Sequence, residues 1–268
     1  MDLMTGLAII CLLMVAVAFS PLGLGGGILY VPIMHYMLDW EIKEAIVASL
    51  TLVLMVSLGS SLAHSKSGHA DQRVAKWGRI AAVPSATIGV LLSGVLLSLV
   101  GDIGIKILAA LVITFVLERT IRKSVAHTVE YTEEQLLEKR NQYLAGSSSA
   151  GIAAGILGIG GGAILVTLNR SMLKMDAKKA AGTSYLVTAT IVPVALLSHL
   201  VINQNLDVIV DNSGIFAIVL VPLMVFSSAF LGAKYAIKYL PKQVVTGVFL
   251  FVVSISLLRY IVDFLTVI

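Results

Sequence analysis

Long apolar runs follow one another along almost the whole chain, separated by short polar or glycine-rich intervals. In the first half these runs cover 3–19, 28–38, 45–63, 80–100 and 103–117. After a polar interval at 122–141, further runs cover 143–157, 163–173, 180–202, 214–231 and 244–261. Apolar runs near 20 residues can cross a bilayer as α-helices, in which every backbone polar group is bonded internally. The pattern therefore predicts an all-α polytopic membrane protein.

A glycine-rich motif interrupts this pattern twice. It reads LGLGGGI at 22–28 and returns, 135 positions later, as LGIGGGA at 157–163. Glycine in a helix interior costs ~1 kcal/mol relative to alanine, so a run of glycines marks a helix break or a close approach of backbone. The apolar runs after the motifs, 28–38 and 163–173, are too short to cross untilted. We expect each half to contain a short helix, a glycine break and a half-helix, followed by three transmembrane helices.

The same spacing relates other residues of the two halves, as in the match between His64 and His199. The pattern predicts a first transmembrane repeat at 1–124 and a second at 142–268. A cytoplasmic linker at 125–141 then joins the two repeats.

This linker contains a helix-start signal. Thr132 is followed three residues later by Gln135, which is the capping-box pattern that precedes many helices. We expect a short surface helix here, and a disordered linker is the alternative.

Loop charges indicate how the two halves are oriented, because positively charged loops face the cytoplasm. The loop after the third apolar run carries Lys66, Arg73, Lys76 and Arg79, and the interval 170–179 carries Arg170, Lys174, Lys178 and Lys179. The first-half counterpart of 170–179, at 39–44, then lies outside, as does 203–212, which has no Lys or Arg. We therefore expect inverted repeats. If the broken segments instead cross the bilayer once as bent helices, the repeats become parallel.

Composition agrees with a bilayer environment. Apolar residues make up 58% of the chain, charged residues 13%, and the mean hydropathy is +0.97, which lies far from soluble norms. The formal net charge of +4 comes from short loops, which suits anionic lipid and gives no sign of nucleic-acid binding. The first apolar run lacks a basic start and a cleavage pattern, so we interpret it as a retained segment.

The sequence carries no motif for catalysis, metal binding or a cofactor. Cys11 is the only cysteine, which excludes an intrachain disulfide and a thiolate metal site. The string at 158–163 fits G-x-G-x-x-G/A, but neither a soluble strand nor an acidic ribose partner accompanies it. We expect no enzymatic activity, no cofactor and no metal.

The glycine motifs are the candidate binding site. The first amides of a helix lack internal partners and lie at the positive end of its dipole, so a half-helix start can bind an anion. Glycine adds positive φ angles and leaves no side chain in the way. The predicted binding residues are Gly25, Gly26, Gly27, Gly160, Gly161 and Gly162. The alternative is close helix packing, since pairs such as Gly151 and Gly155 also fit the G-x-x-x-G spacing.

Hydroxyl groups follow each half-helix. Ser49 and Thr51 in the first half, and Thr183 and Ser184 in the second, can donate hydrogen bonds to an oxyanion held by the glycines. Their alternative role is to bond carbonyls of their own helices.

Two histidines and two prolines complete the candidates. His64 and His199 could relay a coupling proton, or they could each be satisfied by a backbone partner. Pro84 and Pro222 occur within apolar runs of the two halves and predict helix kinks.

The chain resembles the TauE/SafE family of sulfite exporters, also called the transmembrane permease family for sulfur compounds. The residues that carry the resemblance are the GLGGG motif at 23–27 with Val31-Pro32 downstream, and the GIGGG motif at 158–162 followed by KAAGTS at 179–184. The second half has Val166-Thr167 where the family motif has Val-Pro. The resemblance implies a plasma-membrane carrier for small anions such as sulfite or organosulfonates.

These observations lead to one expected function with two alternatives. We expect a secondary transporter, acting as an exporter, that binds its small anionic substrate between two half-helices and moves it by alternating access. The alternatives are an anion channel and a membrane accessory subunit that transports nothing and uses its glycines for helix packing. Substrate, direction, coupling ion and oligomeric state stay open at this stage.

Overall fold

The computed structural model describes residues 3–123, 131–203, 206–239 and 241, together with single positions between 244 and 265. Helices dominate this part of the chain, and no strand occurs in it, as the sequence predicts. The helices of the first half are α1 (Leu3–Phe19), α2 (Gly27–Met37), α3 (Ile42–Lys66), α4 (Gln72–Val100) and α5 (Asp102–Lys123). Those that follow are α6 (Glu133–Glu138), α7 (Arg140–Leu157), α8 (Gly162–Ser171), α9 (Ala177–Asn203), α10 (Leu206–Ser213) and α11 (Ile215–Tyr239).

Four helices of the described residues are long and apolar enough to cross a membrane. They comprise Ile42–Lys66, Gln72–Val100, Ala177–Ile202 and Ala217–Tyr239. Large apolar side chains on their outer faces, such as Leu91, Leu197 and Leu223, are more than half exposed. Exposed apolar surface on this scale suits lipid rather than water, so the chain is a membrane protein.

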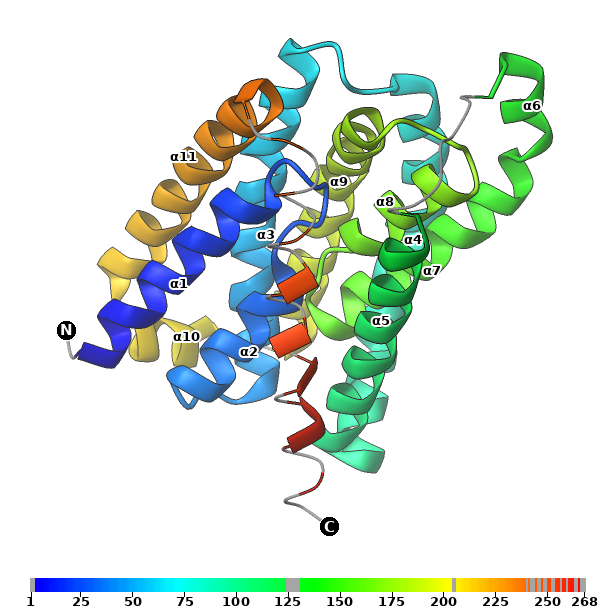
Figure 1. Ribbon diagram of the computed structural model, residues 1–268. Coiled ribbons are helices and arrows are strands. Elements are labelled where there is room, and N and C mark those ends of the chain that lie inside the picture. Colours follow the sequence, from blue (N-terminus) through cyan, green and yellow to red (C-terminus); the bar gives the residue numbers. More distant parts are fainter. Residues whose placement is uncertain are drawn as a thin grey trace.

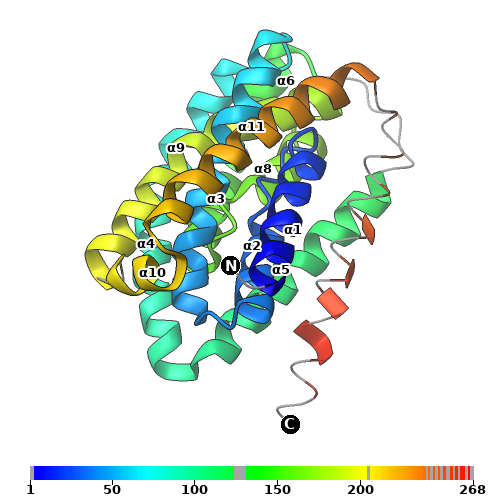
Figure 2. The same cartoon turned by 90° about the vertical axis from the view of Figure 1, so that its left-hand side faces the viewer.

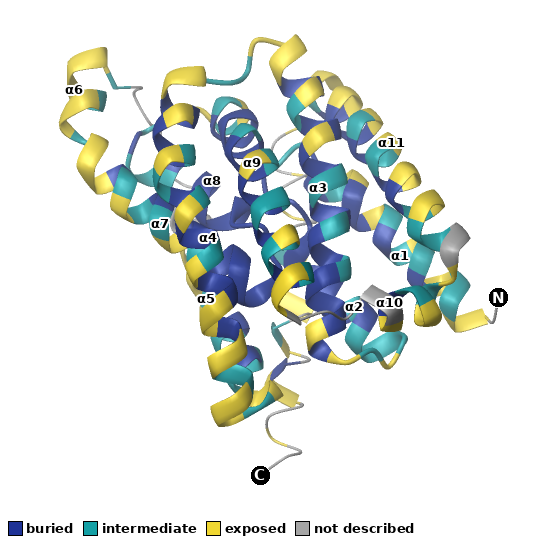
Figure 3. Ribbon diagram, turned by 180° about the vertical axis from the view of Figure 1, so that it is seen from behind, coloured by how far each residue is buried: buried dark blue, intermediate teal, exposed yellow. Residues whose placement is uncertain are grey.

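The helices form a layered bundle (Figure 1). α3 and α9 pack together in the middle, with α1 and α11 on one side and α4 and α7 on the other. In Figure 2 the long helices α3, α9 and α11 run side by side with a similar tilt. Buried residues concentrate in the interior around α3, α8 and α9, whereas the outer face of α5 is exposed (Figure 3).

Both glycine motifs break a helix, as predicted. α1 ends at Phe19 and α2 begins at Gly27, while α7 ends at Leu157 and α8 begins at Gly162. The glycines with positive φ are Gly23, Gly25 and Gly26 in the first break and Gly158, Gly160 and Gly161 in the second. Because L side chains rarely adopt these angles, the glycines are required by the backbone conformation itself.

Close packing of α4 on α7 accounts for a different pair of glycines. A Cβ atom on Gly155 would lie 2.6 Å from the backbone nitrogen of Val90, and one on Gly151 would collide with the carbonyl of Ala82. Gly89 of α4 faces Ile152 in the same way. For Gly151 and Gly155 the packing interpretation is therefore confirmed. We refer to this contact between α4 and α7 as the small-residue seam.

The short helix expected between the two halves is present. α6 begins with the expected capping box, in which the Thr132 amide donates to the Gln135 side-chain oxygen at 3.0 Å and the Gln135 amide donates to the Thr132 hydroxyl at 3.5 Å. The first part of the predicted linker, 125–130, and much of the last apolar run lie outside the described residues. The repeat limits 1–124 and 142–268 stay a prediction.

One element is not anticipated from the sequence. The interval 203–212, treated above as an outer loop, contains α10. The side chain of Ile209 is buried, and Asn212 donates to the Glu44 carboxylate at 3.4 Å. The short helix is thus held by tertiary contacts to α3 that no local signal reveals.

Candidate functional site

The two glycine breaks lie against each other in the middle of the bundle. A Cβ atom on Gly27 would lie 2.8 Å from the carbonyl oxygen of Gly158, and one on Gly162 would lie 2.9 Å from the carbonyl oxygen of Gly23. These two contacts are equivalent, because Gly162 lies 135 positions after Gly27 and Gly158 lies 135 positions after Gly23. Val53 of α3 contacts both Gly25 and Gly160 and so covers one side of the contact between the two breaks.

A matching pair of serines holds the breaks together. The Ser49 hydroxyl donates to the carbonyl of Gly158 at 2.8 Å, and the Ser184 hydroxyl donates to the carbonyl of Gly23 at 2.8 Å. Both serines are fully buried. Each serine therefore clamps the break of the opposite half, and its proton is engaged by a carbonyl. We call Ser49 and Ser184 the serine clamps.

The two predicted threonines lie away from the breaks. Thr51 donates to the Val47 carbonyl of its own helix at 3.2 Å, which is the alternative role considered above. Thr183 accepts a hydrogen bond from the amide of Asp71 at 2.9 Å, at the loop before α4. Thr183 thus fixes the start of α4, whereas Thr51 lines a cavity described below.

The two histidines also occupy equivalent positions. His64 Nε2 lies 3.2 Å from the carbonyl of Ser20, and His199 Nε2 lies 2.7 Å from the carbonyl of Gly155. Since a carbonyl oxygen only accepts, Nε2 is the donor in both contacts. Both side chains are buried. Each histidine therefore tethers the end of the short helix that precedes a break.

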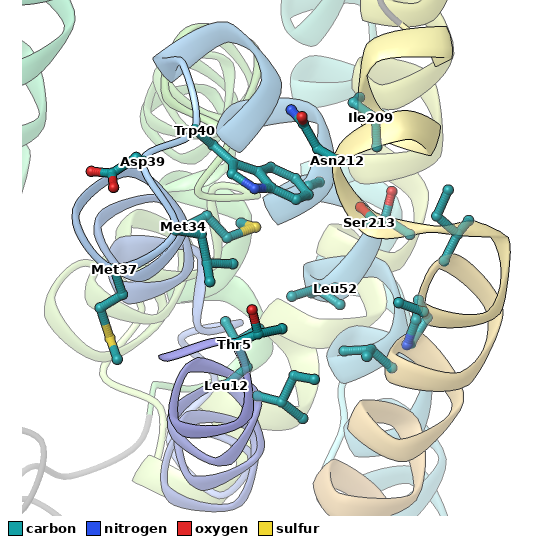
Figure 4. A pocket seen from close by; sticks show the side chains of 18 of the residues that line it. Thr5, Leu12, Met34, Met37, Asp39, Trp40, Leu52, Ile209, Asn212 and Ser213 are labelled. Atoms are coloured by element: carbon teal, nitrogen blue, oxygen red, sulfur yellow. The ribbon is translucent and has the colours of Figure 1, made fainter. Parts of the chain in front are cut away.

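A cavity of about 440 Å³ opens between α1, α2, α3, α10 and α11 (Figure 4). Asp39 and Trp40 from the loop after α2 line it, as do Asn212 and Ser213 of α10. Its other lining residues include Leu12, Met34, Thr51, Leu52 and Pro222. This volume suits a small ligand.

Both predicted prolines lie inside helices, Pro84 in α4 and Pro222 in α11. Only Pro222 belongs to the cavity wall. Of the predicted site residues, Thr51 and Pro222 therefore line the cavity, and the glycines do not.

Four buried hydroxyls around the breaks were not singled out from the sequence. Tyr30, Ser57, Ser60 and Thr188 are fully buried, and their oxygens have no hydrogen-bond partner among the described residues. Ser57 and Ser60 precede His64 by seven and four positions, so all three share one face of α3. This helical spacing of polar residues inside an apolar run is the signal that could have revealed them.

Charge is nearly absent from the interior. Among the described residues no Lys or Arg side chain is buried, and Glu44 is the buried carboxylate. No cluster of His, Cys, Asp or Glu that could hold a metal ion occurs in this part of the chain. The groups near the breaks are therefore neutral dipoles, namely hydroxyls and backbone amides.

The sequence model of the sulfite exporter TauE/SafE family matches residues 8–260. The chain belongs to this family. It is also similar to a probable membrane transporter protein of Methanocaldococcus jannaschii, with 25% identity over 257 residues and 90% of each chain covered. No solved structure matches the chain. Family membership confirms the resemblance and makes the TauE/SafE chain a membrane transporter.

Proposed function

We propose that this chain is a secondary transporter that exports small sulfur-containing anions, such as sulfite or organosulfonates, across the plasma membrane. The observation that carries the proposal is the reciprocal contact of Gly27 with Gly158 and of Gly162 with Gly23 at the centre of the bundle. A helix start buried inside a membrane protein can offer backbone amides to an anion without a buried cation, which would be costly there. Broken helices at equivalent positions are typical of secondary transporters.

We further propose that the halves are inverted repeats. In Figure 1 the outer ends of α1 and α2 both lie toward the lower side, whereas α7 starts beside α6 at the upper side. The two serine clamps lie 135 positions apart, as do the two histidines, and the members of each pair make equivalent hydrogen bonds. This correspondence supports a pseudo-twofold relation between the halves.

Loop charges support a cytoplasmic assignment for the upper side. Lys179 Nζ lies 3.8 Å from the Asp71 carboxylate, so the basic loops around 66–79 and 174–179 meet at one end of the bundle. Lys178 Nζ also donates to the carbonyl of Ile237 near the end of α11, at 2.9 Å. In this orientation Asp39, which lines the cavity, lies on the outer side.

Alternating access then has a physical basis in the difference between the halves. In the proposed repeat α1 corresponds to α7, and α11 corresponds to α4. The cavity separates parts of α1 and α11, whereas α7 and α4 are in close contact along the small-residue seam. In the transport cycle one repeat rocks against the other, so that the seam side opens while the cavity closes.

A flux assay in proteoliposomes tests this function. The purified protein is expected to move radiolabelled sulfite or methanesulfonate, and Gly26→Leu is expected to abolish the flux because Gly26 has φ 88° and abuts the Tyr30 ring. Gly94→Ala is the matched control, since a Cβ atom there meets nothing within 4 Å. Absence of flux for sulfite, methanesulfonate and sulfate in folded wild-type protein would reject the proposal. Currents in electrical recordings too large for a carrier would identify a channel instead.

A further inference from the structure

We propose that the anion site is asymmetric and takes singly charged sulfur oxyanions: it is built on the start of α2 rather than shared equally by α2 and α8. This inference rests on the proposed transport function and specifies its site and substrate class. It follows from the different residues at the two half-helix starts and from the buried, unpartnered Tyr30 hydroxyl beside one of them.

The start of α2 faces a hydroxyl group. Gly26 caps the helix, and a Cβ atom on it would lie 3.0 Å from the Tyr30 hydroxyl oxygen. Side chains on a helix lean toward its N-terminus, which brings the Tyr30 ring over the helix start. The Tyr30 hydroxyl is fully buried and has no hydrogen-bond partner in the described part of the chain. This hydroxyl is therefore free to donate a hydrogen bond to an anion at the start of α2.

The start of α8 lacks this group. The residue equivalent to Tyr30 is Leu165, which has no donor. A Cβ atom on Gly161, the cap of α8, would lie 2.6 Å from the carbonyl oxygen of Ala150. A carbonyl oxygen also lies beside the start of α2, since a Cβ atom on Gly27 would lie 2.8 Å from the carbonyl oxygen of Gly158, so backbone carbonyls do not distinguish the two helix starts. Among the described residues, the α2 start is therefore the one with a buried, unpartnered tyrosine hydroxyl beside its cap.

More hydroxyls surround the first break. Tyr185 of α9 donates to the carbonyl of Phe19, the last residue of α1, at 2.7 Å. Ser57 lies between Val53, which contacts Gly25, and Ser60 on the same face of α3.

Thr188 lies one turn beyond Tyr185 and has its methyl group beside Gly160. Ser57, Ser60 and Thr188 are fully buried and have no hydrogen-bond partner among the described residues. Buried polar groups are normally satisfied, so this cluster indicates a ligand that arrives during transport.

The charge of the ligand follows from the charge of the site. No Lys or Arg side chain is buried among the described residues, and His64, one turn beyond Ser60, has Nε2 engaged by the Ser20 carbonyl. An anion must therefore be stabilised by neutral donors. The cost of removing an ion from water rises with the square of its charge, about fourfold from a monoanion to a dianion. A site of this kind favours an alkanesulfonate or hydrogen sulfite over sulfate.

The test compares Tyr30→Phe with Tyr143→Phe in the full-length protein. Tyr143 is an equally buried tyrosine that packs against Gly78 at the α4–α7 contact, away from the breaks. The probes are methanesulfonate and sulfate, which have similar shapes and different charges. The readouts are the melting temperature with and without each probe and the flux of each radiolabelled probe in proteoliposomes.

In wild type, methanesulfonate should raise the melting temperature and be transported, and sulfate should do neither. Tyr30→Phe should keep the ligand-free melting temperature while losing the methanesulfonate shift and roughly tenfold or more of the flux, as expected for one lost hydrogen bond to an anion. Tyr143→Phe should behave as wild type. Ser57→Ala, a smaller change in the same cluster, should also weaken the shift.

The outcomes separate the two proposals. A full methanesulfonate response in both Tyr30→Phe and Ser57→Ala would overturn the asymmetric site while leaving transport intact. Equal binding of sulfate and methanesulfonate would overturn the selection for single charge. If wild type neither binds nor moves methanesulfonate, sulfite or sulfate, the proposed function itself fails.

Discussion

The serine clamps give the sharpest test of how the two breaks are held together. Ser49→Ala removes the donor to the Gly158 carbonyl, and Ser184→Ala removes the donor to the Gly23 carbonyl. Each carbonyl belongs to a buried glycine and would lose its partner from the opposite half. Both substitutions also shorten a fully buried side chain by one oxygen atom.

The expected cost can be worked out from these contacts. Hydrogen bonds between membrane helices average ~0.6 kcal/mol in double-mutant cycles. Leaving a buried acceptor without a partner costs more, on the order of 1–3 kcal/mol. We therefore expect each substitution to lower the free energy of unfolding by about 1–2 kcal/mol. Because the clamped breaks contact each other, the double substitution should deviate from additivity.

Unfolding by sodium dodecyl sulfate in mixed micelles, followed by circular dichroism, measures these values. Ser227→Ala is the matched control, because Ser227 is exposed and donates to the Leu223 carbonyl of its own helix at 3.0 Å. The control should change the free energy of unfolding by less than about 0.5 kcal/mol. If Ser49→Ala and Ser184→Ala unfold like this control, the serines do not stabilise the breaks and our reasoning is wrong.

Two further predictions concern the seam and the cavity. Gly155→Leu should destabilise the protein by ~3 kcal/mol or more, because the carbonyl of Ala86 leaves no space for a side chain. Unfolding in mixed micelles measures this change. A stability equal to that of Gly94→Ala would refute the prediction. In a Cys11→Ser background, Ser213→Cys at the cavity should react with a membrane-impermeant thiol reagent, whereas Ser60→Cys, fully buried, should react far more slowly in the absence of substrate. Equal labelling rates would contradict the burial of the hydroxyl cluster.

The glycine pattern was sufficient to predict the position of both breaks. Positive φ angles at Gly25, Gly26, Gly160 and Gly161 are a local requirement that only glycine meets easily, so the sequence records it directly. The capping box before α6 is local in the same sense, since Thr132 and Gln135 are three residues apart. The apolar runs likewise predicted the four candidate spans, whereas the predicted span at 103–117 lies in α5, which is not one of these four.

The roles of the candidate side chains could not be obtained in this way. Ser49 bonds a carbonyl 109 positions away, and Ser184 bonds one 161 positions away. Their hydroxyls were expected at an anion and instead hold backbone in this conformation. Thr183 likewise pairs with the amide of Asp71 across the two halves. Such partners are chosen by packing between distant segments, which residue type and spacing do not specify.

The sequence by itself determined that this is a helical membrane protein with two broken helices and that the two breaks are related by a repeat. Only the tertiary structure decided which groups surround each break. Tyr30 and Leu165 occupy equivalent positions in the repeat, yet the structure places an unpartnered, buried hydroxyl over the helix start only on the Tyr30 side of this pair. The physical reason is that helix breaks follow from local backbone conformation, whereas a binding site depends on which distant atoms the bundle packs around it.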